Sequence, residues 1–509
     1  MNAVAVDRVS ISYVGWRSCK PTNRLGFRQS IALLAIVFLL DVSVGRAEDY
    51  VLTIGGGYSP EGNQVSLEKN VLLFQRMLSE QSADLARNDI YFADGDAPTK
   101  DVLVHDHDRL PEANRLMAQV FGRTEALGLT YRNHEIPNVL DASRPETIRA
   151  WFRDHGSKMH DGDRLIIYVT AHGHRGRDSN REYDTSIAMW DQSALRMTEF
   201  AKLLDEMDPK VDVVMVMVQC YTGGFAHLIY KGGIPQNGLS PQKRVGFYAT
   251  VHDRPAAGCT PEVNEANYEE YSTFFWAALR GIDRIGNRIE RPDYNGDARI
   301  SLDEAHAYVI LNADTIDLPV KTSDEYLRVE SKFGEGESDL LRKDESFETV
   351  LKYASPVQTV LLEKLSEKLN LTGENRIVDA RRRPRNDRRR GGPSRRNSET
   401  RNRIANDLLN RWPELRNPFN PLVTEMLTTR SEEFINAVKV HPDYKQFRDE
   451  LAKRTSATSG VVSNVHYERF LRVTDSIVLA ENLRRLKNLS KITEYEAIVA
   501  AEQETLLSP

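Results

Sequence analysis

Two stretches of the chain consist almost entirely of apolar residues, at positions 165–171 and 211–218. Continuous apolar runs of this length are typical of strands that are buried on both faces of a parallel sheet. Each run is followed by small and polar residues, which mark the passage from a strand into a loop. The pattern therefore predicts two buried parallel strands with polar side chains at their carboxyl ends.

Amphipathic segments accompany these strands. Apolar residues recur at helical spacing in 66–81, and the same spacing occurs in 198–208. Over residues 50–310 apolar strands alternate with such segments, as in a parallel sheet covered by helices. We therefore predict an α/β fold with a three-layer, doubly wound and mainly parallel sheet.

The pattern changes beyond about residue 320. Segments 345–370 and 404–509 show helical spacing and contain no buried-strand run. We expect a helical extension over 321–375 and a C-terminal helical domain over 404–509.

An arginine-rich stretch at 376–403 separates these two parts, and residues 381–383 and 388–390 are all arginine. Such a segment has no apolar face and repels itself, so we expect a disordered, solvated linker. A processing site, or a patch for an acidic surface or polymer, are the alternatives.

The N-terminus resembles a secretory leader. Arg24 and Arg28 precede the apolar run 31–40, and small residues follow before an acidic pair. We expect a signal peptide over 1–47 and export of the protein to a periplasmic, extracellular or other secretory compartment. The alternative is an uncleaved N-terminal anchor. We expect no stable membrane span in the mature form, since no other segment is long and apolar enough.

The amino-acid composition limits the kinds of binding partner and cross-link that we expect. A formal net charge of −6 does not imply a nucleic-acid partner, and of three cysteines only Cys220 and Cys259 lie beyond the expected leader. So few thiols argue against a disulfide scaffold. A disulfide between these two remains an alternative.

The two predicted strands end in an imidazole and a thiol. His172 and Gly173 follow the first strand, and Cys220 follows the second, 48 positions after His172. Ligands of open α/β sheets bind at the carboxyl ends of the strands, so both side chains are expected at that edge. This arrangement predicts a cysteine peptidase with a Cys/His dyad. His174 as the base, and an inert buried Cys220, are the alternatives.

These motifs resemble the caspase-like (clan CD) cysteine peptidases, and within them the legumain-like branch. The resemblance rests on residues 167–173 and 216–223, with 50–57 similar to the first strand and 247–250 to the strand before the specificity loop. It implies a peptidase domain over 48–320.

The resemblance also implies roles for individual residues. Cys220 is expected to be the nucleophile, and His172 the group that protonates the leaving amine. The backbone N–H groups of Gly173 and Cys220 are expected to stabilise the oxyanion. We also expect the helix dipole beyond Cys220 to lower the pKa of the thiol.

We do not expect the protein to share the substrate specificity of the legumain-like branch. Val218 stands where the branch has a glutamate, and no arginine lies near Gly62 or Asn63. Acidic residues at 269 and 270, close to Ser272, fall where the branch has a pocket acid. We therefore expect Glu269, Glu270 and Ser272 to contact a protein or peptide substrate. Solvated carboxylates are the alternative for the two glutamates. The expected activity is that of a cysteine-type endopeptidase working through a thioester. A catalytically inactive binding module, or a transpeptidase using the same dyad, are the alternatives.

A second motif predicts a structural calcium site. Residues 293–304 match the ligand spacing of an EF-hand loop, with helices expected on both sides. Ala298 replaces the glycine that normally makes the sharp turn, so weaker binding is expected. An acidic turn without calcium is the alternative. The expected ligands are Asp293, Asn295, Asp297, Arg299 through its carbonyl, Ser301 and Glu304.

Overall fold

The structure is a computed structural model of the chain. The expected leader and residues 383–398 of the expected linker lie outside the part that it describes. The described residues are 48–81, 84–106, 109–122, 124, 127–336, 339–382, 399–456 and 459–507.

The described residues form a nine-stranded sheet in which seven strands follow the order β11-β10-β9-β6-β1-β2-β5. All neighbours on this path are parallel except the pair β10–β11. The hairpin β7–β8 attaches to the end of β6, and β3–β4 form a separate two-stranded sheet. The strands are β1 Asp49–Gly56, β2 Leu85–Phe92, β3 Val102–His105, β4 Leu129–Arg132, β5 Val139–Asp141, β6 Arg164–His174, β7 Ser186–Met189, β8 Ser193–Arg196, β9 Asp212–Met217, β10 Arg244–Tyr248 and β11 Val320–Lys321.

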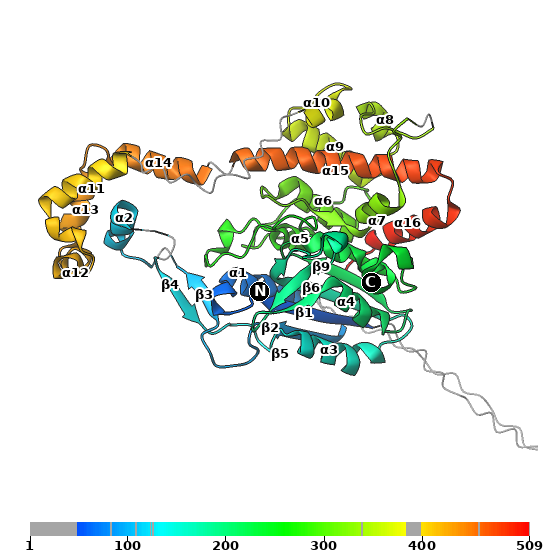
Figure 1. Ribbon diagram of the computed structural model, residues 1–509, viewed down its shortest axis with the longest axis horizontal. Coiled ribbons are helices and arrows are strands. Elements are labelled where there is room, and N and C mark those ends of the chain that lie inside the picture. Colours follow the sequence, from blue (N-terminus) through cyan, green and yellow to red (C-terminus); the bar gives the residue numbers. More distant parts are fainter. Residues whose placement is uncertain are drawn as a thin grey trace, which may run out of the picture. The chain divides into compact units, whose positions relative to one another are not determined.

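Helices cover both faces of the sheet, which confirms the three-layer α/β prediction (Figure 1). One face packs against α1, α5, α6, α7 and α16, and the other against α3 and α4. The helices of these two layers are α1 Val65–Glu80, α3 Pro145–Asp154, α4 Met197–Asp205, α5 Tyr271–Arg280, α6 Leu302–Asn312, α7 Thr322–Glu330 and α16 Leu489–Glu502.

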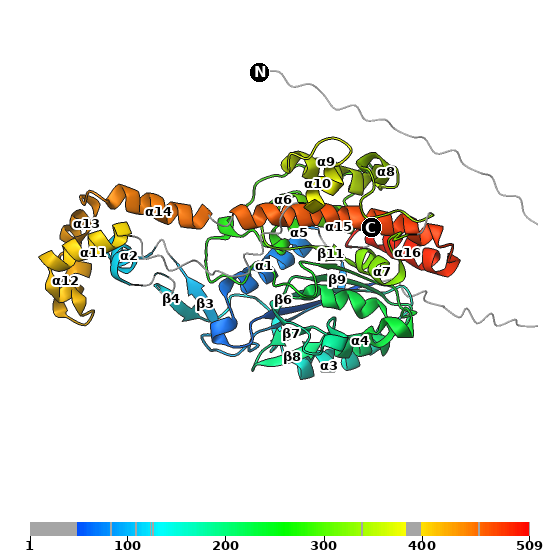
Figure 2. The same cartoon turned by 45° about the horizontal axis from the view of Figure 1, so that its top comes forward.

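Alternation along the strands explains why both layers form. In β6, Ile166 and Tyr168 join the core under α1 and α5, whereas Ile167 and Val169 join the core under α3 and α4. Successive strand side chains point to opposite faces, so an uninterrupted apolar run supplies both cores. Figure 2 shows the two helical layers on either side of the strands.

The strand order reverses at β1. From β1 the sheet continues to β2 and β5 on one side, and to β6, β9 and β10 on the other. The loops that leave the carboxyl ends of β1 and β6 therefore diverge. Such a switch point is where open α/β sheets form their ligand crevice.

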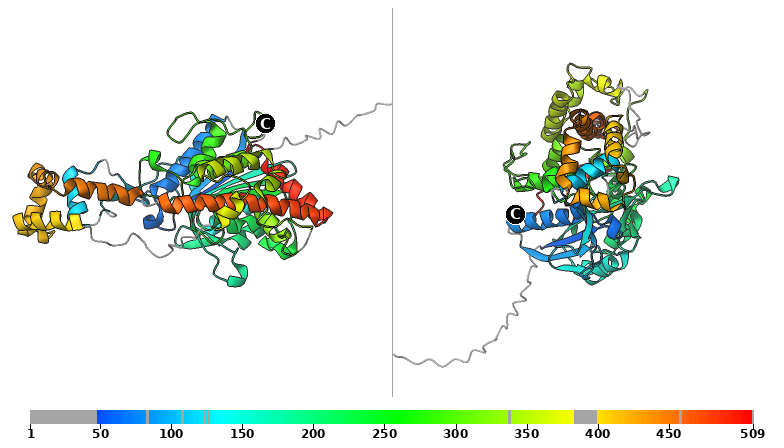
Figure 3. Two further views of the ribbon diagram at one scale, coloured as in Figure 1. Left: turned by 90° about the horizontal axis from the view of Figure 1, so that it is seen from above. Right: turned by 90° about the vertical axis from the view of Figure 1, so that its left-hand side faces the viewer.

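The C-terminal region does not form one separate domain, contrary to the expectation for 404–509. Helix α15 Ser459–Arg485 packs against α9 and α7, and α16 belongs to the core of the sheet. Arg164 at the start of β6 donates hydrogen bonds of 3.0 and 3.1 Å to the carbonyls of Thr505 and Leu506. The last helices thus complete the core around the sheet. The course of α15 is visible in Figure 3.

Two smaller helical clusters account for the rest. Helices α8 Phe347–Leu351, α9 Pro356–Lys368 and α10 Arg376–Arg382 share an apolar core with α15. The prediction of a disordered linker over 376–403 is therefore wrong for its first residues, because α10 forms there and Ile377 and Ala380 are buried in that core.

The second cluster joins distant parts of the chain. Helix α2 Glu112–Phe121, which lies between β3 and β4 in the sequence, packs with helices that follow residue 398. These are α11 Glu399–Arg411, α12 Pro421–Leu427, α13 Ser431–Lys439 and α14 Tyr444–Ser456. Within the described residues, no helix combines the length and apolar character that a membrane crossing requires.

Candidate active site

The pairing of β6 with β9 brings His172 and Cys220 to the same edge of the sheet. Val169 pairs with Met217, and the amide of Val218 donates to the carbonyl of Val169 at 3.0 Å. His172 and Cys220 each lie three residues beyond this paired position. Two neighbouring parallel strands therefore present the imidazole and the thiol at their carboxyl ends, beside the switch point.

Gly173 sits directly against the loop that carries the thiol. A Cβ atom at this position would lie 2.1 Å from the carbonyl oxygen of Cys220 and 2.9 Å from Cγ of Gln219. Only glycine permits such an approach. The reason for glycine here is therefore contact with the neighbouring strand end.

The imidazole of His172 is oriented by the loop that follows β1. Its Nε2 lies 2.9 Å from the carbonyl oxygen of Gly62 and 2.9 Å from Oε1 of Gln64. Both partners are acceptors, so Nε2 carries the proton and Nδ1 keeps its lone pair. The ring of Tyr58 packs edge-on against the imidazole. No hydrogen bond joins the ring to the Cys220 thiol in the described part of the chain.

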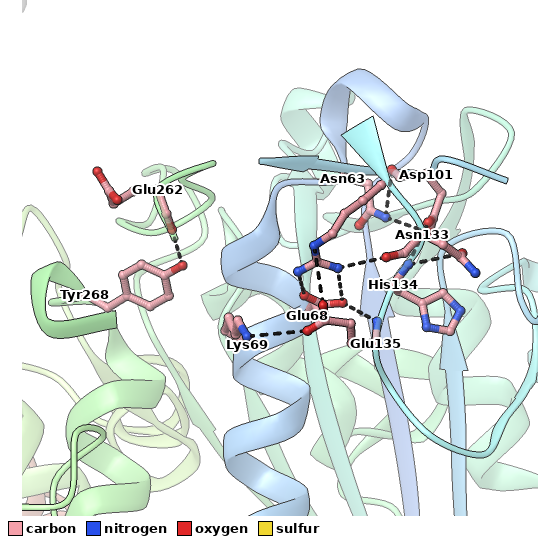
Figure 4. Close-up of polar contacts among 10 residues, drawn as sticks. Asn63, Glu68, Lys69, Asp101, Asn133, His134, Glu135, Glu262 and Tyr268 are labelled. Carbon is pink, nitrogen blue, oxygen red and sulfur yellow. Dashed lines mark hydrogen bonds and ion pairs between the residues drawn. The ribbon is translucent and has the colours of Figure 1, made fainter. Parts of the chain in front are cut away.

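A buried polar cluster fixes that loop in turn (Figure 4). Asn63 accepts a hydrogen bond from the amide of Gly57 at 2.9 Å and donates to the Asp101 carbonyl and carboxylate at 3.1 and 3.2 Å. Asp101 also accepts from the amide of His134 at 3.1 Å. Burial, and then the nearby Asp94, raise the pKa of Asp101 to about 6.

Glu68 strengthens the same region from helix α1. Its carboxylate is fully buried and receives two hydrogen bonds from Arg132, at 2.8 and 2.5 Å. The amide of Glu135 donates to the same carboxylate. Charge-assisted forked pairs of this kind hold their elements firmly. The strand β4 is thereby tied to the start of α1, next to the loop that orients His172.

Cys220 lies at a sharp turn between β9 and a 3-10 helix over Thr222–Ile229. Tyr221, the next residue, has a left-handed backbone with φ of 62°. For a residue other than glycine this conformation costs about 1–2 kcal/mol. Glycine is needed at both Gly223 and Gly224. A Cβ atom at Gly223 would lie 2.7 Å, and one at Gly224 would lie 2.3 Å, from an atom of a neighbouring loop.

The thiol faces the loop that follows β10. The amide of Ala256 donates to Sγ at 3.4 Å, and Sγ lies 3.8 Å from the Ala256 carbonyl. Burial raises the pKa of the Cys220 thiol, and it lowers the pKa of the His172 imidazole. The expected lowering of the thiol pKa is therefore wrong, because desolvation outweighs the backbone hydrogen bond from Ala256 that would lower it. Both Cys220 and Cys259 are free thiols, so they do not form a disulfide.

The same loop is held from behind by residues of the C-terminal region. The amide of Ala257 donates to the buried carboxylate of Asp317 at 2.6 Å. Arg469 of α15 is 2% exposed and donates to the carbonyls of Ala313 and Asp317 at 2.6 and 2.9 Å. Arg254 pairs with Glu468 of α15 at 2.6 Å. Helix α15 thus shapes the loop opposite the thiol.

The three residues expected to contact substrate are not gathered at one surface. Glu269 is exposed, whereas Glu270 is 4% exposed and lies 3.5 Å from Arg284. Ser272 is fully buried, with its hydroxyl 2.7 Å from that of Tyr168. Arg284 already balances the charge of Glu270. A role for these residues in substrate binding stays a prediction, and the burial of Ser272 argues against it.

The expected calcium loop has the expected backbone turn. Ala298 adopts φ of 64°, and its amide donates to Oδ2 of Asp293 at 2.9 Å. Ile300 is buried, and α6 begins within the loop at Leu302. The expected helix before the loop ends early, because α5 stops at Arg280, thirteen positions before Asp293. Oδ1 of Asp293 is buried without a hydrogen-bond partner in the described residues. That oxygen fits a role as a metal ligand.

The carboxylate of Glu304, expected to bind calcium, forms hydrogen bonds within the loop instead. Its carboxylate accepts hydrogen bonds from the amides of Tyr294 and Asn295 at 2.7 and 3.1 Å, and from Ser301 at 2.9 Å. It also completes a capping box with Ser301 at the start of α6. Within the described chain, no three His, Cys, Asp or Glu residues are grouped closely enough to hold a metal ion. Binding would therefore require Glu304 to exchange these bonds for the cation.

Comparisons with known proteins add little. No protein-family model matches the chain, and no curated protein matches it. Among solved structures, the crystal structure of protein GSU0716 from Geobacter sulfurreducens is similar at a TM-score of 0.29 and 9% identity. That similarity covers 52% of this chain and 88% of that chain. It is too low to carry an argument about fold or function.

Several residues of the site have no clear signal in the sequence. The Gly62 carbonyl is a backbone group, and Gln64 and Ala256 are unremarkable residue types in loops. Arg469 lies 249 positions beyond Cys220, in the long helix α15. A buried arginine in a helical pattern resembles any surface arginine until the packing is known.

Proposed function

We propose that the protein is a cysteine-type endopeptidase in which Cys220 is the nucleophile and His172 is the general acid and base. One observation carries the proposal. His172 and Cys220 lie at equivalent positions of adjacent parallel strands, and the partners of Nε2 leave Nδ1 able to accept a proton.

The reaction begins from a neutral pair. Because burial raises the thiol pKa and lowers the imidazole pKa, neither group is charged near neutral pH. As Sγ attacks the carbonyl carbon of the scissile peptide, the thiol proton passes to Nδ1 of His172. The imidazolium that forms is stabilised by the Gly62 carbonyl, which accepts from Nε2–H throughout.

Collapse of the tetrahedral intermediate completes the cycle. The carbon–nitrogen bond breaks, and His172 returns the proton to the leaving amine, which yields a thioester on Cys220. Water then attacks the thioester with His172 as base, and releases the carboxylic acid and the thiol. Backbone N–H groups of Gly173 and Cys220 are proposed to stabilise the oxyanion in both steps.

Two other functions use the same fold. A transpeptidase would resolve the thioester with an amine instead of water, and an inactive binding module would use neither residue. The left-handed turn at Tyr221 favours a catalytic reading, because backbone strain beside a nucleophile is a feature of functional sites. Export through the N-terminal 47 residues remains part of the proposal.

A structural calcium ion is proposed for the loop at 293–304. Asp293, Asn295, Asp297, Ser301 and Glu304 would supply side-chain oxygens, and Arg299 would supply its carbonyl. Bound there, the ion would neutralise the acidic loop and fix it against the start of α6. The buried unpartnered oxygen of Asp293 supports this assignment.

The test of the peptidase proposal is active-site labelling of the purified full-length chain. An acyloxymethyl ketone peptide is expected to label Cys220, as mapped by mass spectrometry, and unlabelled enzyme should cleave a fluorogenic peptide library. Cys220→Ala and His172→Ala should abolish cleavage and leave the melting temperature close to that of the wild type.

Two further variants control for the loss of any thiol or any histidine. Cys259→Ala removes the other described thiol, and His441→Ala removes a histidine between α13 and α14. Both variants should cleave peptides like the wild type. His174→Ala should reduce cleavage less than His172→Ala does. Cleavage that survives in His172→Ala but disappears in His174→Ala would contradict the dyad. Labelling of Cys220 without cleavage of any peptide would favour the binding module.

A further inference from the structure

A pocket of about 560 Å³ adjoins the end of β6, and five of its twelve lining residues are arginines. It is bordered by the β7–β8 hairpin and by the helices α3 and α4. Its basic residues are Arg149, His174, Arg175, Arg177, Arg181 and Arg196.

Three acidic residues in the same lining already have partners. Asp178 pairs with Arg181 at 3.1 Å, and Glu199 pairs with Arg149 at 3.5 Å. Asp184 accepts from the amide and hydroxyl of Thr198, at 3.1 and 2.9 Å, and lies 3.9 Å from Arg196. These carboxylates balance three of the five arginines.

Arg175 and Arg177 remain unbalanced. Neither makes a hydrogen bond or ion pair with any residue of the described chain, and both are exposed. Arg177 lies close enough to His174 to help lower the pKa of that imidazole, after the larger effect of burial. The pocket therefore holds two guanidinium groups whose charge is uncompensated, and it attracts an anion.

The pocket is next to the proposed dyad. His174 and His172 are two residues apart in β6, and both pair with β7. Alternate residues of a strand share a face and lie about 7 Å apart. The edge of the pocket that His174 lines is therefore about 7 Å from His172, a span of about two residues of an extended peptide.

We propose that this pocket binds an acidic side chain of the polypeptide substrate, one or two residues from the scissile bond. The inference rests on the proposed peptidase function. It assigns Arg175 and Arg177 as specificity residues, each offering a planar fork that matches a carboxylate. A peptide fits better than a polyanion because only two positive charges are uncompensated and they adjoin the peptide-cleaving edge.

Binding can be measured without cleavage. Fluorescent decapeptides that carry Asp or Glu at successive positions are titrated into full-length Cys220→Ala, alongside peptides with Asn or Gln at the same positions. The acidic peptides are expected to bind about tenfold more tightly, the range of a charge-assisted hydrogen bond. The preference should shrink as the salt concentration rises.

Paired variants locate the effect. Arg175→Gln with Arg177→Gln, added to Cys220→Ala, should remove the preference for acidic peptides and leave binding of the amide peptides unchanged. Arg342→Gln is the control, since Arg342 is an exposed arginine that pairs with Asp344 elsewhere. Circular dichroism and melting temperatures verify that each variant is folded.

The outcomes separate the two proposals. Equal affinity for acidic and amide peptides, or a preference that survives the double substitution, would overturn the pocket assignment whether or not the wild type cleaves peptides. Binding of inorganic phosphate with no preference for acidic peptides would overturn it too. If acidic peptides bind through Arg175 and Arg177 but wild type cleaves none of them, the pocket stands and the peptidase proposal fails.

Discussion

The α-carbon of Gly173 approaches the backbone of Cys220 so closely that an added Cβ would lie 2.1 Å from the Cys220 carbonyl oxygen. This contact joins the histidine-bearing strand end to the thiol-bearing turn. It sets how near the imidazole and the thiol lie, because neither strand end can move without the other.

Gly173→Ala is expected to lower the free energy of unfolding by about 1–3 kcal/mol, the usual cost of overpacking. It should also abolish peptide cleavage, since the turn at Cys220 must shift to admit the methyl group. Urea denaturation and a peptide assay measure the two effects. Gly122→Ala is the control, because a Cβ there finds its nearest neighbour at 3.5 Å without a positive φ. Wild-type activity in Gly173→Ala would contradict the contact.

Alkylation of Cys220 should depend on pH as expected for a neutral thiol. Burial raises its pKa, so the thiolate forms only above the range of an ordinary cysteine, which is half-ionised near pH 8.5. The rate of carbamidomethylation at Cys220, followed by mass spectrometry, is expected to keep rising beyond pH 9. A rate that is already constant between pH 6 and 7 would indicate a thiolate–imidazolium ion pair instead.

Asp101 should make the stability of the protein depend on pH. Its pKa is raised to about 6 in the folded state, against about 3.9 in the unfolded chain. The folded protein therefore binds the proton more tightly, and its stability falls as the pH rises from about 4 to 6. Asp101→Asn should remove this fall. It should raise the stability at pH 7 by less than about 3 kcal/mol, because an asparagine side chain cannot accept both the bond from Asn63 and the bond from the His134 amide. Melting curves at pH 4 to 8 test it, and parallel curves for variant and wild type would count against it.

Arg469 is expected to be essential for folding of the region opposite the thiol. It donates to several backbone carbonyls between Ile310 and Asp317, all of them buried with it. Arg469→Met should cost about 3 kcal/mol or more, because those carbonyls lose a charged donor. Arg484→Met, at an exposed position of the same helix, should change the free energy of unfolding by less than about 0.5 kcal/mol. Equal effects of the two substitutions would refute the role of Arg469.

Calcium is expected to raise the melting temperature of the full-length protein, since a ligand that binds only the folded state stabilises it. At 100 times its dissociation constant the gain would be about 2.7 kcal/mol. Glu304→Gln should abolish the calcium-dependent shift. Ala298→Gly should raise the melting temperature in calcium and in chelator alike, because Ala298 already adopts a φ of 64° and glycine accommodates it without strain. The same melting temperature in calcium and in chelator would exclude the site.

Much of the fold follows from local patterns. The apolar runs at 165–171 and 211–218 lie within or beside β6 and β9, and the helical patterns at 66–81 and 198–208 overlap α1 and α4. These elements could be predicted because burial on both faces, or on one stripe, leaves a periodic trace in a short segment. The polar residues that follow each strand could be assigned to one edge for the same reason.

Long-range packing was not predictable in this way. The expected independent helical domain at 404–509 divides among three cores, because α11 to α14 pack with α2, α15 packs with α8 to α10, and α16 packs on the sheet. The apolar face of an amphipathic helix predicts that the helix packs against another element, but the sequence pattern does not identify that element. The same ambiguity concealed Arg284 as the partner of Glu270.

The sequence by itself therefore determined the class of fold, the strand ends that carry His172 and Cys220, and the spacing of the loop at 293–304. Only the tertiary structure decided which atom of His172 holds the proton, that the thiol pKa is raised, and that Arg175 and Arg177 have no partner among the residues that the structure describes. Those properties depend on contacts between residues far apart in the chain. Desolvation and hydrogen bonding act through distance in space, and spacing along the chain does not encode them.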